Sequence, residues 1–127
     1  MPKNITWKAQ TSVTGGPSSS TSQSIPIEAY DEIEVELADG DTNEEVEVQP
    51  GGAGQVRFLQ ITASSYGVKL SYRVKATGNP PHILDRPLVL AGEGAVGLLG
   101  FAPTKLFFTN TLGSDTTIHV LVGRNAT

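Results

Sequence analysis

The chain of 127 residues contains no cysteine, which excludes disulfide bonds, thiolate catalysis and cysteine-ligated zinc or iron–sulfur sites. It also lacks a run of 18 apolar residues, and its N-terminus has no apolar signal-peptide core. We therefore expect a protein made in a cytoplasm, without a membrane partner. One domain of this length buries roughly two-thirds of its unfolded surface, so it is stable without a disulfide or a structural metal.

Basic residues are missing from the whole stretch between Ala9 and Val56, where ten of the thirteen acidic residues lie. That stretch carries a charge of −10, the remainder carries +6, and the whole chain carries −4. This balance argues against nucleic acid as a partner, because a nucleic-acid footprint is net basic. Two arrangements stay open: acidic and basic strands pair within one sheet, or the opposite charges lie on different surfaces.

Alternation of apolar and polar residues with a period of two is the strongest pattern in the sequence. Residues 68–76 and 33–37 both alternate in this way, which predicts strands with one face on a core. Segments rich in Gly, Pro, Asn, Asp and Ser, such as 39–41, 50–54 and 78–81, separate the alternating runs. The sequence therefore predicts an all-β fold, a single-domain antiparallel β-sandwich that is jelly-roll-like and has about eight strands. The expected strands are residues 5–14, 25–37 with a break near 30–31, 45–49, 55–63, 68–76, 84–90, 105–111 and 116–122, and the core-facing residues of 68–76 are Val68, Leu70, Tyr72 and Val74.

Two segments depart from the strand pattern and define the expected organisation of the chain. Residues 15–24 are rich in Gly and Ser and predict a flexible loop, which makes residues 1–14 an N-terminal strand or arm and 25–127 the sandwich core. Residues 91–103 mix glycine with apolar side chains, among them Leu98, Leu99 and Phe101. An apolar, glycine-rich loop of this kind predicts cover from a neighbouring protein.

The motifs that could carry chemistry are weak. Residues 92–97 fit G-x-G-x-x-G, but Gly100 and Pro103 interrupt the helix that a dinucleotide site requires. Asp39, Asp41 and Asn43 match the first ligand positions of a calcium loop, whereas the later positions do not fit. We expect a turn there, with a weak Ca²⁺ site as the alternative.

The two histidines, His82 and His119, form no metal-ligand pair, and no serine occupies a G-x-S-x-G elbow. We therefore expect no enzyme and no cofactor. Carbohydrate binding needs exposed aromatic platforms, for which Trp7, Tyr30 and Tyr66 are candidates. For Tyr66, packing over the end of a hairpin is the favoured interpretation.

One polar face of the 68–76 segment is basic. Lys69, Arg73 and Lys75 project from it, and they are expected to pair with glutamates in the same molecule or on a neighbouring copy. The glutamates concerned are Glu32, Glu34, Glu36, Glu45 and Glu47.

The last seventy or so residues resemble the small β-sandwich cement or head-decoration proteins of tailed bacteriophages. The segments that carry this resemblance are residues 57–64, 87–90, 94–100, 106–110 and 120–127. The resemblance implies a homo-oligomer, a trimer, that binds the major capsid protein on the outside of the capsid and clamps adjoining capsomers. Such a protein assembles in the host cytoplasm, which suits a cysteine-free chain.

The residues expected at these interfaces are Ile5, Trp7, Leu98, Leu99, Phe101, Phe107, Lys69, Arg73, Lys75, Glu34 and Glu36. We expect the apolar loop and Phe107 to bury against sibling subunits, and the charged faces and the arm to meet the shell. A carbohydrate- or receptor-binding β-sandwich and a tail or baseplate protein remain as alternatives.

Overall fold

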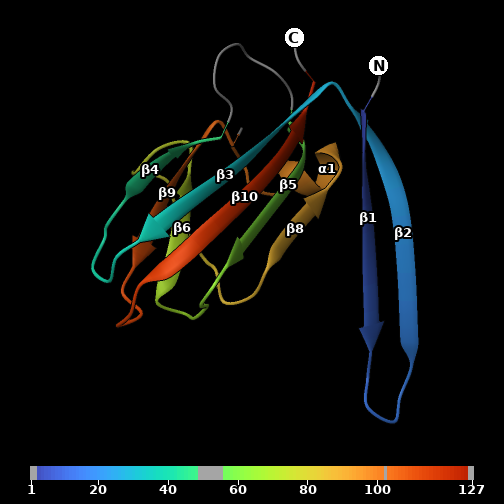
Figure 1. Ribbon diagram of the computed structural model, residues 1–127, viewed down its shortest axis with the longest axis horizontal. Helices are drawn as coiled ribbons and strands as arrows, with labels where there is room; N and C mark the ends of the chain where they lie inside the picture. The colour runs from blue at the N-terminus through green and yellow to red at the C-terminus, as the bar shows by residue number, and fades with distance from the viewer. Residues whose placement is uncertain (1–2, 49–55, 102, 126–127) are drawn as a thin grey trace.

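The computed structural model describes residues 3–48, 56–101 and 103–125, which form two four-stranded antiparallel sheets and a two-stranded hairpin (Figure 1). The all-β antiparallel sandwich predicted from the sequence is confirmed. The hairpin consists of β1 (Lys3–Ser12) and β2 (Ser18–Ile27). The strand order of the first sheet is β3 (Ala29–Leu37), β10 (Thr116–Arg124), β5 (Val56–Ala63) and β8 (Leu88–Ala91). The strand order of the second sheet is β4 (Glu44–Glu47), β9 (Lys105–Asn110), β6 (Leu70–Val74) and β7 (Pro81–Ile83).

The eight sandwich strands pair in a nested manner. The first strand, β3, pairs with the last, β10, and likewise β4 with β9, β5 with β8 and β6 with β7. Such nesting is what a long hairpin produces when it is rolled up, and it is the feature that a jelly-roll-like chain path requires. The nesting brings the acidic strands β3 and β4 to an edge of their respective sheets.

The inner faces of the two sheets form one apolar core. Leu59, Val120 and Phe108 are among its fully buried members, and the rings of Tyr72 and Phe108 lie 6.2 Å apart. The buried polar residue Asn110 has its hydrogen-bonding groups satisfied. Its Nδ2 donates to the Leu37 and Ser114 carbonyls, and its Oδ1 accepts from a backbone N–H. The buried amide therefore connects the β9–β10 turn to the end of β3 by hydrogen bonds, and because its groups are paired its burial costs little free energy.

Several strand boundaries differ from the predicted ones. The alternating segment 68–76 is a strand only from Leu70 to Val74, because the chain leaves the ladder at Lys75, which has a φ of 73°. Val68 lies outside the core with 70% of its surface exposed. The strand expected at 84–90 begins only at Leu88, as β8, whereas β7 precedes the expected range; the buried Leu84 belongs to the connection between these two strands.

The loop predicted at residues 15–24 is correct only for its first part. Ser18–Ser24 belong to β2 and pair with β1 in continuous register. Hydroxyl contacts between strands, Thr6 to Ser24 and Thr11 to Ser19, accompany the backbone ladder. Serine and threonine have little apolar area to bury, but they do not prevent a two-stranded ladder. A prediction based on composition therefore missed the strand at residues 18–24.

The apolar segment 91–103 is also more ordered than expected. Residues 93–97 form the short helix α1 (Glu93–Gly97), which begins after Gly92 in a left-handed conformation with φ 94°. Val96 and Leu99 point into the core. The predicted turn at 50–54, the adjoining ends of the strands expected at 45–49 and 55–63, and residues 1–2 and 102 lie outside the described residues.

The contrast between Val74 and Val68 gives a matched test of the core. Val74→Ala removes two methyl groups at a site with 1% exposure, and we expect unfolding free energy to fall by about 2 kcal/mol. Val68→Ala makes the same change at an exposed site and should cost less than about 0.5 kcal/mol. Urea denaturation followed by circular dichroism measures both. Equal losses of unfolding free energy would contradict the described bounds of β6, which place Val74 inside the strand and Val68 outside it.

Burial raises the pKa of Tyr72 from 10.0 to about 12. Between these values the unfolded chain has lost the phenolic proton while the folded chain keeps it, so stability is intact below pH 10 and falls as pH rises towards 12. The expected loss is roughly 1 kcal/mol per pH unit. Tyr72→Phe removes this contribution, so its stability should fall less steeply than that of the wild type over the same range. Parallel curves would contradict the assignment.

Candidate docking groove beneath the N-terminal hairpin

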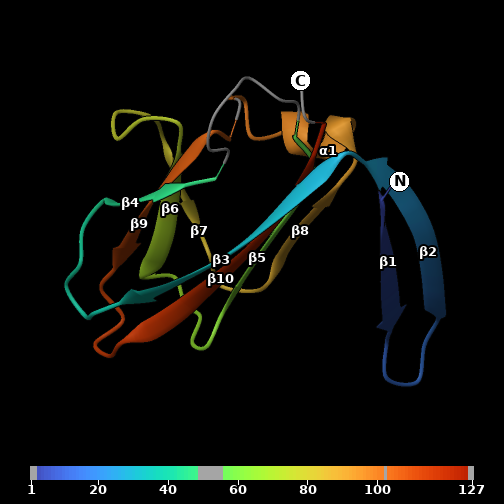
Figure 2. The ribbon, with the colours of Figure 1, turned by 45° about the horizontal axis from the view of Figure 1, so that its top comes forward.

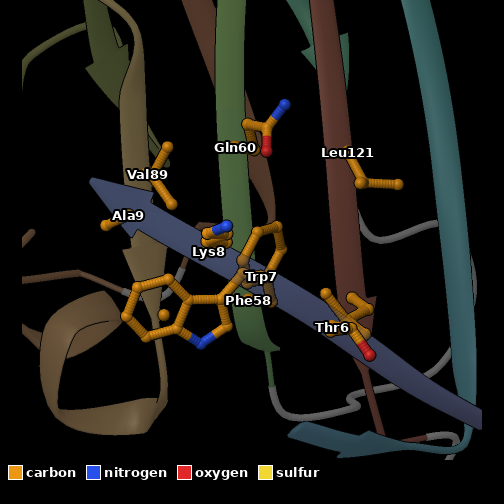
Figure 3. Close-up of a pocket in the computed structure, with 10 residues that line it drawn as sticks. Thr6, Trp7, Lys8, Ala9, Phe58, Gln60, Val89 and Leu121 are labelled. Atoms are coloured by element: carbon orange, nitrogen blue, oxygen red, sulfur yellow. The ribbon is translucent and has the colours of Figure 1, made fainter. Parts of the chain in front are cut away.

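The N-terminal hairpin lies over the outer face of the first sheet. Figure 3 shows β1 crossing β8, β5 and β10, with Trp7 and Phe58 among the residues around the intervening space. Phe58 points to the outer side of β5 and is absent from the main core, yet it is only 1% exposed. The hairpin therefore creates a second, smaller apolar cluster. We call Ile5, Trp7 and Ile27 the anchor and Phe58, Leu121 and Gly123 the socket.

Gly123 shapes the socket. A Cβ atom at this position would lie 2.3 Å from Ile5 Cδ1 and 3.1 Å from Ile27 Cγ2, so only glycine leaves room for the anchor as it stands. Gly123 pairs with Phe58, whereas the next pair joins Arg124 to Val56, so Arg57 is an extra residue in β5. This bulge lets Phe58 face the hairpin while Val56 faces the main core.

Two cavities flank β1 where it crosses the sheet. The larger, of about 510 Å³, is lined by Trp7, Lys8, Gln60, Val89 and Leu121 among others; the smaller, of about 430 Å³, extends from Ile5 towards Lys3 and Tyr30. The indole Nε1 of Trp7 is buried and has no hydrogen-bond acceptor among the described residues. The groove formed by these two cavities is thus mainly apolar, and Lys8 and Lys3 line one cavity each.

The far part of the hairpin makes no contact that buries it. Every residue from Lys8 to Ser24 is exposed, and residues 9–27 include no charged side chain. Within the described residues β1 and β2 pair only with each other, which leaves both outer edges of the hairpin open (Figure 1). Natural proteins usually guard such edges with charge, proline or cover. From Ala9 to Ser12 and from Ser18 to Ser24 the two strands carry neither charge nor proline, and edges of this kind are suited to pairing with another chain.

The interface residues expected in the 91–103 segment and on β9 separate into two groups. Leu98 and Phe101 are 81% and 42% exposed, and we call them the apolar tip. The prediction for Leu99 and Phe107 is wrong, since both are buried within the single chain. Leu99 joins the main core, and Phe107 lies in register between Glu45 and Arg73, whose long side chains flank it.

The expected pairing of the basic face with the glutamates is not found among the described residues. Arg73 donates through Nη1 to the Asn79 carbonyl at 2.6 Å, and only Arg73 of the three basic residues lies within β6. Lys69 and Lys75 are exposed, as are Glu34 and Glu36 on β3, which belongs to the other sheet. The ion pairs that the described residues do form are Arg57–Glu93, Lys105–Glu45 and Arg124–Asp31, and His119 Nε2 lies within hydrogen-bond distance of Glu32 Oε1.

The turn that resembles a calcium loop is held by hydrogen bonds to the protein's own backbone. Asp41 accepts from the Ala38 N–H, and Asp39 accepts from the Gly113 N–H. The described residues contain no group of three His, Cys, Asp or Glu side chains placed to bind a metal. These contacts favour the turn interpretation.

Tyr66 packs as its favoured interpretation predicted. Its hydroxyl accepts a hydrogen bond from the Ala63 N–H at 2.9 Å, and its ring packs against the core. Trp7 is half-buried and faces the groove. Of the predicted glycan platforms, Trp7 borders the larger cavity, and Tyr30, which is exposed, borders the smaller.

The sequence singled out Ile5 and Trp7 as arm residues that meet a shell, whereas within the chain they lie over the socket of the first sheet, which sequence reasoning missed. The signal was present in residues 56–61, whose apolar side chains occur on both faces and predict a strand covered on two sides. Nothing in the local pattern indicates that the cover is the N-terminal hairpin, because Ile5 and Gly123 are 118 positions apart.

Comparison of the chain with protein-family models, with curated proteins and with solved structures finds no match. Among the described residues no helix has the length and apolar character needed to cross a bilayer. The function is therefore inferred from the hairpin, the groove and the apolar tip.

The single tryptophan of the chain, Trp7, reports directly on the groove. Gly123→Leu places a side chain where Ile5 now lies, so we expect the anchor to leave the socket and Trp7 emission to shift to longer wavelength. Gly94→Leu is the matched control, because a Cβ there meets nothing within 4 Å. Unchanged emission in Gly123→Leu, with circular dichroism like the wild type, would contradict the described packing.

Proposed function

We propose that the protein is a non-enzymatic virion structural protein, a capsid decoration or cement protein that stabilises the shell by binding between capsomers. The observation that carries the proposal is the hairpin, which is anchored at its root by Ile5 and Trp7 and leaves a two-edged arm exposed that is uncharged from Ala9 to Ser24. Clamping a shell requires extended complementary surface and no reacting group. An open strand edge supplies such surface through backbone hydrogen bonds to an extended segment of the major capsid protein.

The apolar tip supports a second contact in the same assembly. Leu98 and Phe101 are large apolar side chains exposed close together in the chain, and exposed apolar groups of this kind are typical of protein interfaces. We assign the tip to contacts between sibling subunits in a homotrimer. Glu34 and Glu36 on the β3 edge, together with Lys69 and Lys75 near β6, then provide charged surface towards the shell.

A carbohydrate-binding module is the second candidate, and one observation favours it. Trp7, whose indole N–H has no acceptor among the described residues, lines a groove that also contains Gln60 and Lys8. Sugars combine stacking on aromatic rings with hydrogen bonds of this kind. The same hairpin would suit a tail or baseplate protein, so particle fractionation has to separate head from tail.

Co-sedimentation with phage heads tests the decoration function. We expect the wild-type protein to sediment with purified heads, and the double variant Gln10→Lys/Ser20→Glu to bind at least about tenfold more weakly, because docking would strip water from the new charges. Residues 10 and 20 face each other in the hairpin, so the opposite charges leave the hairpin itself stable.

Ala38→Glu/Thr42→Lys is the control, since it places the same charges in the exposed turn after β3. Wild-type protein that stays in the supernatant would contradict the decoration function, and protein bound to tails would favour the tail alternative. Binding to a glycan array that is lost in Trp7→Ala would favour the carbohydrate-binding module.

A further inference from the structure

We infer that the socket also receives the anchor of a second copy of the chain, so that neighbouring copies exchange their N-terminal hairpins. The exchanged element is β1 with Ile5 and Trp7, carried by β2, and the receiving surface is Phe58, Leu121 and Gly123 of the other copy. This inference does not depend on capsid binding. It concerns the contact between copies, whatever the assembly to which they belong.

The socket is specific for this anchor. Gly123 admits Ile5 to a depth at which an added methyl group would force the Ile5 side chain to shift, and Phe58 is buried by what lies over the outer face of β5. A second copy carries the same anchor and therefore fits the same socket with the same contacts. Exchange of an identical element is a low-cost route to oligomers for this reason, since no new surface has to evolve.

The contact within one chain is loose enough to open. Open clefts of about 510 and 430 Å³ border β1, and the indole N–H of Trp7 is buried without an acceptor among the described residues. Side chains bordered by open clefts have packing partners on fewer sides than side chains in a close-packed interior. Releasing the anchor therefore breaks fewer packing contacts than exposing an equal area of the main core would break.

The hinge is short and well placed. Only Glu28 separates β2 from β3, and Figure 2 shows the chain turning sharply between these strands. The Glu28 N–H donates to the Arg124 carbonyl, next to Gly123. Straightening the chain at this residue would turn β2 and β3 into one extended segment and carry β1 away from its own sheet. Tight hinges of this type favour exchange between chains.

Charge complementarity supports a second copy as the occupant. Lys3 and Lys8 are the only charged residues in the first 27, whereas the remainder of the chain holds seven basic and thirteen acidic residues. Lys3 borders the smaller cavity beside Leu121, and Leu121 is in register with Glu32. A basic hairpin is thus attracted to the acidic body of another copy as well as to its own.

Complementation between two full-length variants tests the inference. Gly123→Leu closes its own socket and frees its hairpin, while Ile5→Ser/Trp7→Ser keeps the socket open and loses the anchor. Both variants also carry Leu98→Ser and Phe101→Ser, so that the apolar tip cannot join copies. We then expect each variant alone to be monomeric by native mass spectrometry and their mixture to form a one-to-one complex. In the mixture, the open socket of the second variant has no anchor of its own to compete for it. The loss of this intramolecular competitor should raise the apparent affinity between the two chains by about a hundredfold. A mixture that remains monomeric would overturn the inference.

A measurement on the wild-type chain covers the case in which a variant does not fold. A mixture of isotope-labelled and unlabelled protein, refolded together at high concentration, should show NOEs between Trp7 of one copy and Phe58 of another. The same sample mixed without unfolding should show them more slowly. If the only Trp7–Phe58 NOEs are those within one chain, the hairpin does not exchange. Binding to phage heads is scored separately, so failure of either proposal leaves the other standing.

Discussion

The contact of Ile5 with the backbone of Gly123 is the interaction on which the functional surface depends. It holds β1 across the outer face of the first sheet, and it thereby buries Phe58, forms the groove and directs the rest of the hairpin into solvent. An isolated two-stranded hairpin is only marginally stable in water. Without this contact the proposed docking arm would have no defined position relative to the sandwich.

The two apolar clusters have different physical characters. The main core lies between two sheets with nested pairing, and its polar member Asn110 is fully hydrogen-bonded. The cluster under the hairpin is flanked by cavities and contains a buried donor without an acceptor among the described residues. A rigid body combined with a weakly held arm suits a protein that joins other proteins, since the body keeps its shape while the arm adapts.

Strand periodicity was informative wherever one face of a strand meets the main core. Leu70, Tyr72 and Val74 are buried as their alternation predicts, and the acidic segment 33–37 forms an edge strand. The same rule misplaced Val68, since alternation continues beyond the point where the ladder ends. It also treated Leu99 and Phe107 as interface residues, because a residue's apolar character does not reveal whether its cover comes from the same chain.

The amino-acid sequence by itself determined the all-β sandwich, the acidic and basic segments and the unusual N-terminal arm, because these follow from local pattern and composition. Only the tertiary structure decided that residues 18–24 are a strand, that Phe58 and Gly123 receive the arm, and that the apolar tip is reduced to Leu98 and Phe101. The physical reason is that each of these outcomes depends on pairing or packing between parts of the chain. The energy of such contacts is not a property of either part alone.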